Sequence, residues 1–221
     1  MSVVKSHRLN ISDLSFSDVK SNENGGKTIY LNHKKSKFYM QTPVMSMPYD
    51  MSVYDKGDYP KYSIELSYRD LGEDYRVNGF HENMEALDKL LIYNPIVKKS
   101  KDKETGEIDG RYPDTIRLKL PFRDGEPKFD IMDMDGNPIK NKDPEKLFVK
   151  GANLKAIVRS GGVWIVGGKY GVTWTVEKIR IDAPESLDNY SFVADDTDDD
   201  SGDSGSEDES DGNEVEDSDS D

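Results

Sequence analysis

One segment, residues 150–181, constrains the fold more than any other part of the chain, because it packs three runs rich in Val, Ile, Trp and Thr into a short span. Both tryptophans of the protein, Trp164 and Trp174, lie in it. Glycine-rich breaks at 160–162 and 167–171 separate the runs, and glycine is the residue that tight turns between strands need. The segment therefore predicts a three-stranded antiparallel meander.

The two faces of the first of these strands differ in chemistry. Side chains alternate along a strand with period two, so the even-numbered residues from Leu154 to Val158 form an apolar face opposite Lys155 and Arg159. We expect the apolar face to lie in the core and the other face to be mixed and basic.

The alternation changes register along the last run. Every second residue from Val172 to Val176 is apolar, but the pattern resumes out of step at Ile179. This slip near Glu177 and Lys178 indicates a β-bulge, as in a strand that curves around a barrel. A strand buried on both sides would give the same pattern.

The negative charge of the chain is concentrated at its C-terminal end. Of the 44 Asp and Glu residues, 15 lie between Asp195 and Asp221, where there is no Lys or Arg. The preceding 194 residues are therefore close to neutral, with 30 basic and 29 acidic groups. All 21 aromatic residues lie at or before Phe192. We expect residues 195–221 to be a disordered acidic tail, attached to a body that is free to carry basic patches.

Several kinds of site are excluded by what the chain lacks. It has no cysteine and only three widely spaced histidines, so neither disulfides nor a zinc site is expected. Lys169 follows two glycines but lacks the spacing of a phosphate-binding P-loop. The turn at 133–136 lacks the outer ligands of a calcium loop. We therefore expect a protein that is not an enzyme and has no metal or cofactor.

The N-terminus and the hydropathy pattern bear on localisation. The first residues lack the apolar region of a signal peptide, and no apolar run approaches the length of a membrane span. We expect a soluble intracellular protein that does not contact membranes.

The rest of the chain alternates between short strand patterns and polar connections. Residues 1–26 are mostly polar and predict a partly ordered N-terminal arm, and residues 27–194 predict a β domain. Within that domain, 28–41 predicts a hairpin with a basic tip. Residues 62–68 and 115–122 alternate as half-buried strands.

One helix is predicted, over residues 82–93, because Met84, Leu87 and Leu91 recur at helical spacing before Asn94 and Pro95. The whole chain then reads as six to eight short strands and one inserted helix, without βαβ alternation. This pattern favours a mainly β antiparallel barrel or sandwich.

The body combines aromatic and basic residues, which is the chemistry that single-stranded nucleic acid needs: cations along the phosphates and ring faces for unpaired bases. The candidate binding residues are Lys34, Lys35, Lys37, Tyr39, Arg117, Lys119, Lys155, Arg159, Trp164, Lys169 and Tyr170. Core packing is the alternative role for the tryptophans. It is favoured for Trp174, which alternates in step with its apolar neighbours, whereas Lys169 and Tyr170 are expected to be exposed in their turn.

The acidic tail has two possible roles. A flexible run of carboxylates resembles a nucleic-acid backbone in charge, so it can compete for a basic groove on the same chain. Once displaced, it can recruit basic surfaces of partner proteins. A purely solubilising tail is the alternative.

The segment from Gly167 to Val176, followed by Lys178-Ile179-Arg180-Ile181, resembles the last strands of a single-stranded DNA-binding protein family of nucleocytoplasmic large DNA viruses. That family is similar to the acidic-tailed single-stranded DNA-binding proteins of short-tailed phages. The resemblance covers this segment and the plan of a β body, one mid-chain helix and an acidic C-terminus.

The resemblance implies an OB-fold-like barrel, a role in viral DNA replication and recombination, and a location in the nucleus or at a cytoplasmic viral replication site. It also implies a tail that contacts the DNA polymerase or other replication proteins and affects oligomeric state, with a homodimer as one form. The phage tails end in an aromatic residue, whereas this chain ends Asp219-Ser220-Asp221. Docking of the polymerase through a terminal aromatic residue therefore does not carry over.

Two functions follow from the sequence. The first is a sequence-independent single-stranded DNA-binding protein with a regulatory acidic tail. The second is an acidic-tailed chaperone of basic proteins, such as histones, built on a β-sandwich. Only the first needs a basic and aromatic face, so scattered positions for Lys34, Arg117, Lys155 and Lys169 would favour the second.

Overall fold

A computed structural model describes residues 2–21, 25–57, 59–90, 94–140 and 143–182 of the chain. The predicted acidic tail, residues 195–221, lies outside the described residues.

The centre of the fold is one long hairpin of β14 (Asn153–Val166) and β15 (Lys169–Asp182). The predicted three-stranded meander is wrong, because the break at 160–162 is a bulge within β14 and not a turn. Gly162 has a φ of +86°, and a Cβ there would lie 2.7 Å from the carbonyl oxygen of Ile29. Glycine is therefore required where the chain passes this close to β3 (Lys27–His33).

The bulge predicted in the last strand is confirmed. Ile157 pairs with Lys178 while the next residue, Val158, pairs with Val176, so Glu177 is the extra residue. The bulge brings the apolar residues on both sides of it to the same interior, because it resets the alternation of the strand.

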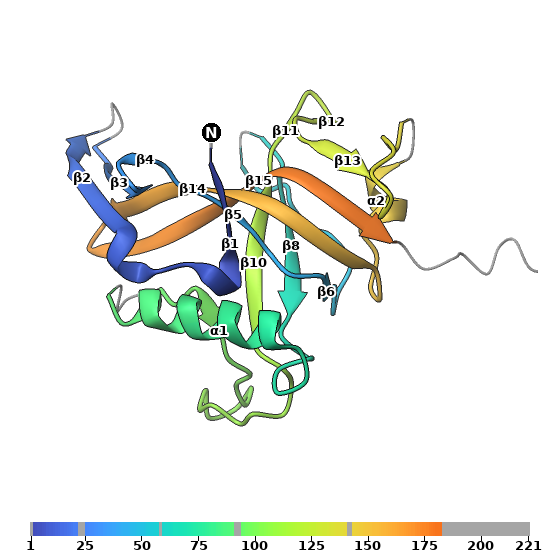
Figure 1. Cartoon of the computed structure of the whole chain (residues 1–221), viewed down its shortest axis with the longest axis horizontal. Coiled ribbons are helices and arrows are strands. Elements are labelled where there is room, and N and C mark those ends of the chain that lie inside the picture. The colour runs from blue at the N-terminus through green and yellow to red at the C-terminus, as the bar shows by residue number, and fades with distance from the viewer. Residues whose placement is uncertain (1, 22–24, 58, 91–93, 141–142, 183–221) are drawn as a thin grey trace, which may run out of the picture. The chain divides into compact units, whose positions relative to one another are not determined.

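Five strand positions close into a barrel (Figure 1). In chain order they are β5 (Tyr39–Gln41) continued by β6 (Met45–Ser46), β8 (Lys61–Ser67), β10 (Thr115–Leu120), β14 and β15. The first pairs with the second, the second with the third, the third with the fifth, the fifth with the fourth, and the fourth with the first. This order and the parallel β10–β15 pairing match an OB-type Greek-key barrel.

The remaining strands extend this barrel at its edges. They are β1 (Val3–Lys5) parallel to β5, β2 (Leu14–Ser21) on β3 (Lys27–His33), β4 (Ser36–Lys37) on β3, β7 (Ser52–Tyr54) on β8, β9 (Val97–Lys98) on β10, β13 (Asp130–Met132) parallel to β15, and the pair β11 (Phe122–Arg123) and β12 (Glu126–Pro127). Strands β1 and β2 bring the described part of 1–26 into the same sheet.

Period-two alternation fills the interior. In β10, Ile116, Leu118 and Leu120 are buried while Arg117 and Lys119 are exposed. Each buried aliphatic side chain of this size contributes about 1.5–3 kcal/mol.

Trp174 is also a core residue, as its alternation indicated. It is only 2% exposed, and its ring lies edge-to-face with Phe38 at 5.6 Å between centroids. It is therefore not available for base stacking.

The inserted helix is α1 (Tyr75–Asp88), which lies below the strands of the barrel in the view of Figure 1. It begins before the predicted start because the Asp74 side chain caps it, accepting a hydrogen bond from the Arg76 N–H at 2.8 Å. The helix ends at Asp88, before the predicted end at residue 93; residues 91–93 lie outside the described residues. The early start of the helix also includes Gly79, a residue of low helix propensity.

Three short helical turns complete the described structure: α2 (Pro144–Leu147), η1 (Ser6–Arg8) and η2 (Ile11–Asp13). Within the described ranges, no helix combines the length and apolar character that a bilayer span requires.

Candidate nucleic-acid interface

Three of the predicted binding residues meet on the outer wall of the barrel. Lys119 of β10 pairs with Thr175 of β15, which pairs with Arg159 of β14, which pairs with Tyr39 of β5. Neighbouring strands lie about 4.8 Å apart, so these side chains form one continuous row across four strands. All four lie on the outward face, because their neighbours along each strand are the buried ones.

The cations of this wall differ in how far they are neutralised. Arg159 Nε lies 2.6 Å from Glu177 Oε1, and Arg117 Nη2 lies 2.7 Å from Glu65 Oε1. Lys119, in contrast, has no carboxylate within ion-pair distance among the described residues. Of the two basic residues predicted on β10, Lys119 is therefore the one whose charge is free for a ligand.

The pKa of Glu65 shows that the charge of Arg117, at one end of the wall, is neutralised by this carboxylate. Burial raises the pKa of this carboxyl, but hydrogen bonds from Lys98 and Arg117 outweigh burial and hold the pKa below its ordinary value. The Lys98 Nζ atom lies 2.8 Å from Glu65 Oε1. This end of the wall is thus an internal charge network.

The hairpin predicted over 28–41 is confirmed only at its basic tip, where β3 pairs with β4. The rest of its second arm, β5, pairs with β14 and β1 and not with β3. Lys34 and Lys35 form its turn with φ angles of 49° and 64°, the values that two-residue hairpin turns require. Lys34 lies 3.4 Å from Asp13, while Lys35 and Lys37 are exposed without a carboxylate partner in the described chain. This tip does not belong to the row on the wall.

The tip of the central hairpin carries the last predicted group. Lys169 is exposed, but Tyr170 is half-buried and packs against the core. Trp164 is also half-buried, and a Cβ on Gly171 would lie 2.9 Å from its Cζ2 atom, so the indole covers this glycine. The expected exposed pair is therefore exposed only at its lysine.

A groove that the sequence did not reveal lies where β8, β10 and the segment before β8 meet, with a volume of about 770 Å³. Its aromatic floor is Tyr62 stacked on Phe122, with ring centroids 4.1 Å apart. Tyr59 is 80% exposed at its edge. Lys61 and Lys119 add positive charge, whereas the charge of Arg123 is offset by Asp124, which also lines the groove and lies 4.0 Å from it.

The position of this groove is meaningful for an OB-type barrel. Such barrels bind oligonucleotides on the face of their second and third strands and with the loop that joins the first two strands. Here those elements are β8, β10 and residues 47–60. The signal in the sequence that could have located the groove is the run Tyr59-Pro60-Lys61-Tyr62.

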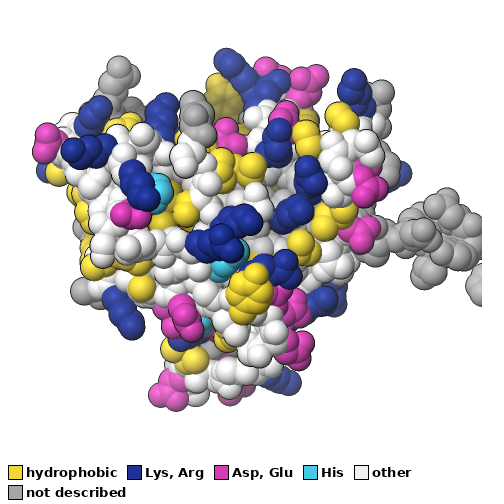
Figure 2. Space-filling view, in the orientation of Figure 1, with side chains coloured by type: hydrophobic (Ala, Val, Ile, Leu, Met, Phe, Trp, Pro, Cys, Tyr) yellow, Lys and Arg dark blue, Asp and Glu magenta, His cyan; other side chains and the backbone are white. Residues whose placement is uncertain are grey.

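Lys155, the remaining predicted residue, lies elsewhere. It lines a small cavity together with Lys5, His7 and Arg76, at the junction of β14, β1 and α1. Figure 2 shows Lys and Arg side chains gathered around a histidine near the middle of the face on which β1, β5 and β14 lie. No carboxylate lies within ion-pair distance of Lys155 in the described part of the chain.

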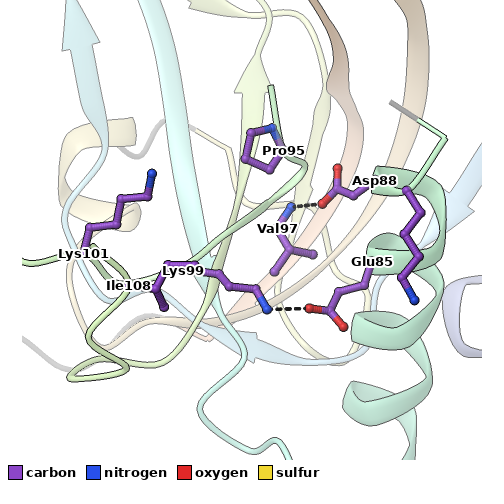
Figure 3. A pocket seen from close by; sticks show the side chains of 8 residues that line it. Glu85, Asp88, Pro95, Val97, Lys99, Lys101 and Ile108 are labelled. Carbon is purple, nitrogen blue, oxygen red and sulfur yellow. Dashed lines mark hydrogen bonds and ion pairs between the residues drawn. The ribbon is translucent and has the colours of Figure 1, made fainter. Parts of the chain in front are cut away.

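A larger cavity beside the C-terminal end of α1 is also lined by lysines, and one of them, Lys99, is paired with an acid (Figure 3). Lys99 Nζ lies 2.7 Å from Glu85 Oε1, and an Asp88 oxygen accepts the Val97 N–H at 2.9 Å. Next to it, His81 Nε2 lies 2.9 Å from Asp114 Oδ2. Although His81, Glu85 and Asp114 come close enough to hold an ion, each already has a protein partner, and we assign them a structural role.

Comparison with known proteins gives no family assignment. No protein-family model matches the chain, and no curated protein matches it. Among solved structures, the chain is similar to the single-stranded DNA-binding protein from bacteriophage Enc34 in complex with ssDNA, at 14% identity and a TM-score of 0.46, covering 76% of this chain and 96% of that chain. It is also similar to gp2.5, a single-stranded DNA-binding protein encoded by bacteriophage T7, at 15% identity and a TM-score of 0.43, covering 74% and 93%. The resemblance to a viral family noted in the sequence stays a prediction.

Proposed function

We propose that this chain binds single-stranded DNA without sequence preference. The observation that carries the proposal is the groove on the second and third strands of an OB-type barrel. There, one exposed ring and two half-buried stacked rings lie beside lysines that have no carboxylate partner among the described residues. Both ingredients of single-strand binding are thus present at the position that this kind of barrel uses.

Each side chain of the groove has a role that follows from its exposure. The Tyr59 ring, 80% exposed, offers a face on which a base stacks, worth about 1–3 kcal/mol. Lys61 and Lys119 contact phosphates, because their charges are not neutralised by carboxylates in the described chain. The wall residues Arg159 and Tyr39 extend the surface across the barrel.

The other predicted cations contribute weaker contacts in this proposal. Lys35 and Lys37 at the β3–β4 tip, and Lys169 at the β14–β15 tip, are exposed and add to the long-range attraction of the DNA. Arg117, held by Glu65, contributes less than Lys119. Binding of this kind reads phosphate charge and ring faces, so it is independent of sequence.

The acidic tail fits the same proposal as a competitor for the basic surface. DNA displaces it, and the freed tail then recruits replication proteins such as a DNA polymerase. In line with the sequence resemblance, the proposal includes a role in viral DNA replication and recombination at the replication site of an infected cell, with a homodimer as one form. No catalytic step is part of the proposal.

One observation favours the second candidate, an acidic-tailed chaperone of basic proteins. Lys34, Arg117, Lys155 and Lys169 lie on four separate elements: the β3–β4 turn, β10, β14 and β15. Against it, the body is a barrel and not the expected sandwich, and the groove is a feature that a chaperone acting through its tail does not need.

Fluorescence anisotropy with labelled oligo-dT separates the two functions. The full chain and a truncation ending at Ala194 are titrated at several salt concentrations, with duplex DNA of the same length as control. We expect tighter binding by the truncation, and a log K that falls with log salt by about 0.7 per phosphate contacted. Absence of binding at low salt, together with binding of histones by the full chain, would replace the proposal by the chaperone function.

A further inference from the structure

The N-terminal end of α1 holds a second surface that the groove does not include. Helix α1 packs closely on η1, because a Cβ on Gly79 would lie only 3.0 Å from the Cβ of His7. Asn83 Nδ2 donates a hydrogen bond to the Ser6 carbonyl oxygen at 2.9 Å. These contacts fix His7 in place, and its ring meets the ring of Tyr75 edge-to-face with centroids 5.6 Å apart.

Positive charge collects around this histidine from three elements. Lys5 of β1, Arg76 of α1 and Lys155 of β14 line the same cavity. Lys5 and Lys155 have no carboxylate within 4.0 Å in the described ranges, whereas Arg76 Nη2 lies 2.7 Å from Asp74. The cavity therefore has a positive field that a single carboxylate does not cancel.

The positive charge around His7 affects the pKa of its imidazole ring. Burial lowers the pKa of His7 below its ordinary value of 6.5, and the charges of Arg8, Lys5 and Arg76 lower it further, while Asp74 acts in the opposite direction. An anion in the cavity would relieve the repulsion that disfavours the imidazolium.

The cavity has the size of a small anion. Its volume is about 120 Å³, which leaves room for a small anion such as one phosphate group. An exposed ring lies next to His7, because Tyr75 is 70% exposed and its ring meets the His7 ring edge-to-face. The Arg76 guanidinium also lies 5.9 Å from the centroid of this ring.

We propose that this junction is a second nucleotide subsite, in which Lys5, Lys155, His7 and Arg76 hold one backbone phosphate of the single strand and Tyr75 stacks on the adjacent base. The subsite rests on the proposed function, since its ligand is the same DNA strand. The exposed ring favours a nucleotide over an acidic peptide, which has charge but nothing to stack.

The barrel wall provides the connection between the two subsites. Lys119 and Arg159 are two strand spacings apart, and Lys155 lies four residues from Arg159 along β14. At about 4.8 Å per strand and about 3.3 Å per residue, the path from Lys119 to Lys155 measures roughly 16 Å. A single strand of DNA that leaves the groove can therefore cross the wall and reach the cavity at the N-terminal end of α1, here called the phosphate cavity.

The test uses the full chain, oligo-dT and charge-matched variants. In the subsite variant Lys5→Gln/Lys155→Gln, we expect about tenfold weaker binding at low salt and a salt slope reduced by about 0.7 for the lost phosphate contact. The control Lys101→Gln/Lys103→Gln removes two exposed lysines from the excursion before β10. It should bind within about twofold of the unchanged chain, because distant charges are screened.

A second pair of variants tests the ring. Tyr75→Ala should weaken binding about tenfold with an unchanged salt slope, since a stacking contact releases no counterions. Tyr112→Ala, which removes another exposed tyrosine, should have no effect. Equal losses in the subsite and control variants would overturn the subsite while leaving DNA binding intact, whereas a complete lack of binding by the unchanged chain would remove the proposed function itself.

The pH dependence of DNA affinity gives an independent test of the role of His7. The groups that face His7 are Lys5, Arg8, Arg76, Asp74 and Lys155, and none of them changes charge between about pH 7.5 and about pH 5.5. Affinity should rise as the pH falls through this range, and His7→Gln should reduce the rise. His33→Gln, which replaces a histidine of β3, is the control, and an identical rise in both variants would overturn the role of His7.

Discussion

Charged side chains surround both ends of α1, but they have different roles at the two ends. At the C-terminal end, Glu85 pairs with Lys99, and Asp88 accepts backbone N–H groups, so that the charges hold the helix to the chain beside it. At the N-terminal end, Lys5 and Lys155 face a cavity without carboxylate partners in the described structure. The first end is a structural network, and the second is free to bind an anion.

This difference shows that the partners of basic residues, and not their number, identify a binding surface. Arg117 and Lys119 lie two residues apart on one face of β10, yet only Arg117 is held by a carboxylate. A buried or half-buried ion pair is costly to separate, so a paired cation is not released to a phosphate at low cost. Unpaired cations next to exposed rings are therefore the residues to test.

The largest expected loss of DNA affinity comes from substitutions in the groove. In the double variant Tyr59→Ala/Lys119→Gln, the loss of one stacked base and one phosphate contact should weaken oligo-dT binding about 100-fold. Both side chains are exposed, so thermal unfolding should be unchanged. The variant Tyr112→Ala/Lys103→Gln is the matched control, and similar affinities for the two variants would contradict the groove.

The next prediction concerns the structural network near the C-terminal end of α1. His81→Ala removes the partner of Asp114, which lies 2.9 Å from Nε2, and leaves a cavity beside Tyr68. Denaturant unfolding should show a loss of about 2 kcal/mol, with unchanged affinity for oligo-dT. A variant of normal stability with weakened DNA binding would instead place the C-terminal end of α1 in the binding surface.

A third variant removes the carboxylate that neutralises Arg117 and Lys98. Glu65→Gln frees Arg117 and Lys98, which now bind this carboxylate, so affinity for DNA should rise about threefold while stability falls by about 1 kcal/mol. Because the pKa of Glu65 is lowered in the fold, its stabilising effect is present above its ordinary pKa and is lost as the pH falls. The stability gap between the unchanged chain and the variant should therefore narrow in acid.

The smallest effects come from the N-cap of α1. Asp74→Ala removes the acceptor of the Arg76 N–H and should lower the free energy of unfolding by about 1 kcal/mol. Asp74→Asn keeps a good cap and should be nearly as stable as the unchanged chain.

Both substitutions at Asp74 release the Arg76 guanidinium, so both should raise DNA affinity slightly at low salt. Hydrogen bonds from Arg76 lower the pKa of Asp74 to about 2, so the stabilisation is lost only as the pH falls from about 4 toward that value. A loss of stability in the Asn variant equal to that in the Ala variant would mean that the ion pair, and not the cap, stabilises the helix.

The sequence predicted most of the β elements because their patterns are local. The strand 115–120, the bulge at Glu177 and the core position of Trp174 all follow from period-two alternation. The helix start was missed because Gly79 is unfavourable in a helix by propensity, and its close approach to His7 depends on a contact distant in the sequence. The break at 160–162 was misread for the same reason, since a glycine bulge and a glycine turn have the same composition.

The binding surface was predicted only in part, because ion pairing is not a local property. Arg117, Lys119 and Lys155 are equivalent in the sequence, and only the fold brings Glu65 to the first of them. The phosphate cavity requires Lys5 and Lys155 to meet through the parallel pairing of β1 with β5, beside β14. No periodicity in the chain indicates that approach.

The most direct test of the account compares two charge-matched triple variants of the full chain in oligo-dT titrations over a range of salt. One removes three cations that have no carboxylate partner in the described chain, Lys5→Gln/Lys119→Gln/Lys155→Gln. The other removes two paired cations and one exposed lysine near the C-terminal end of α1, Lys98→Gln/Lys99→Gln/Lys101→Gln. The account predicts that the first loses at least about 30-fold in affinity, with a salt slope smaller by about 1.4, while the second stays within about threefold. Equal losses of affinity and equal slopes in the two variants would contradict it.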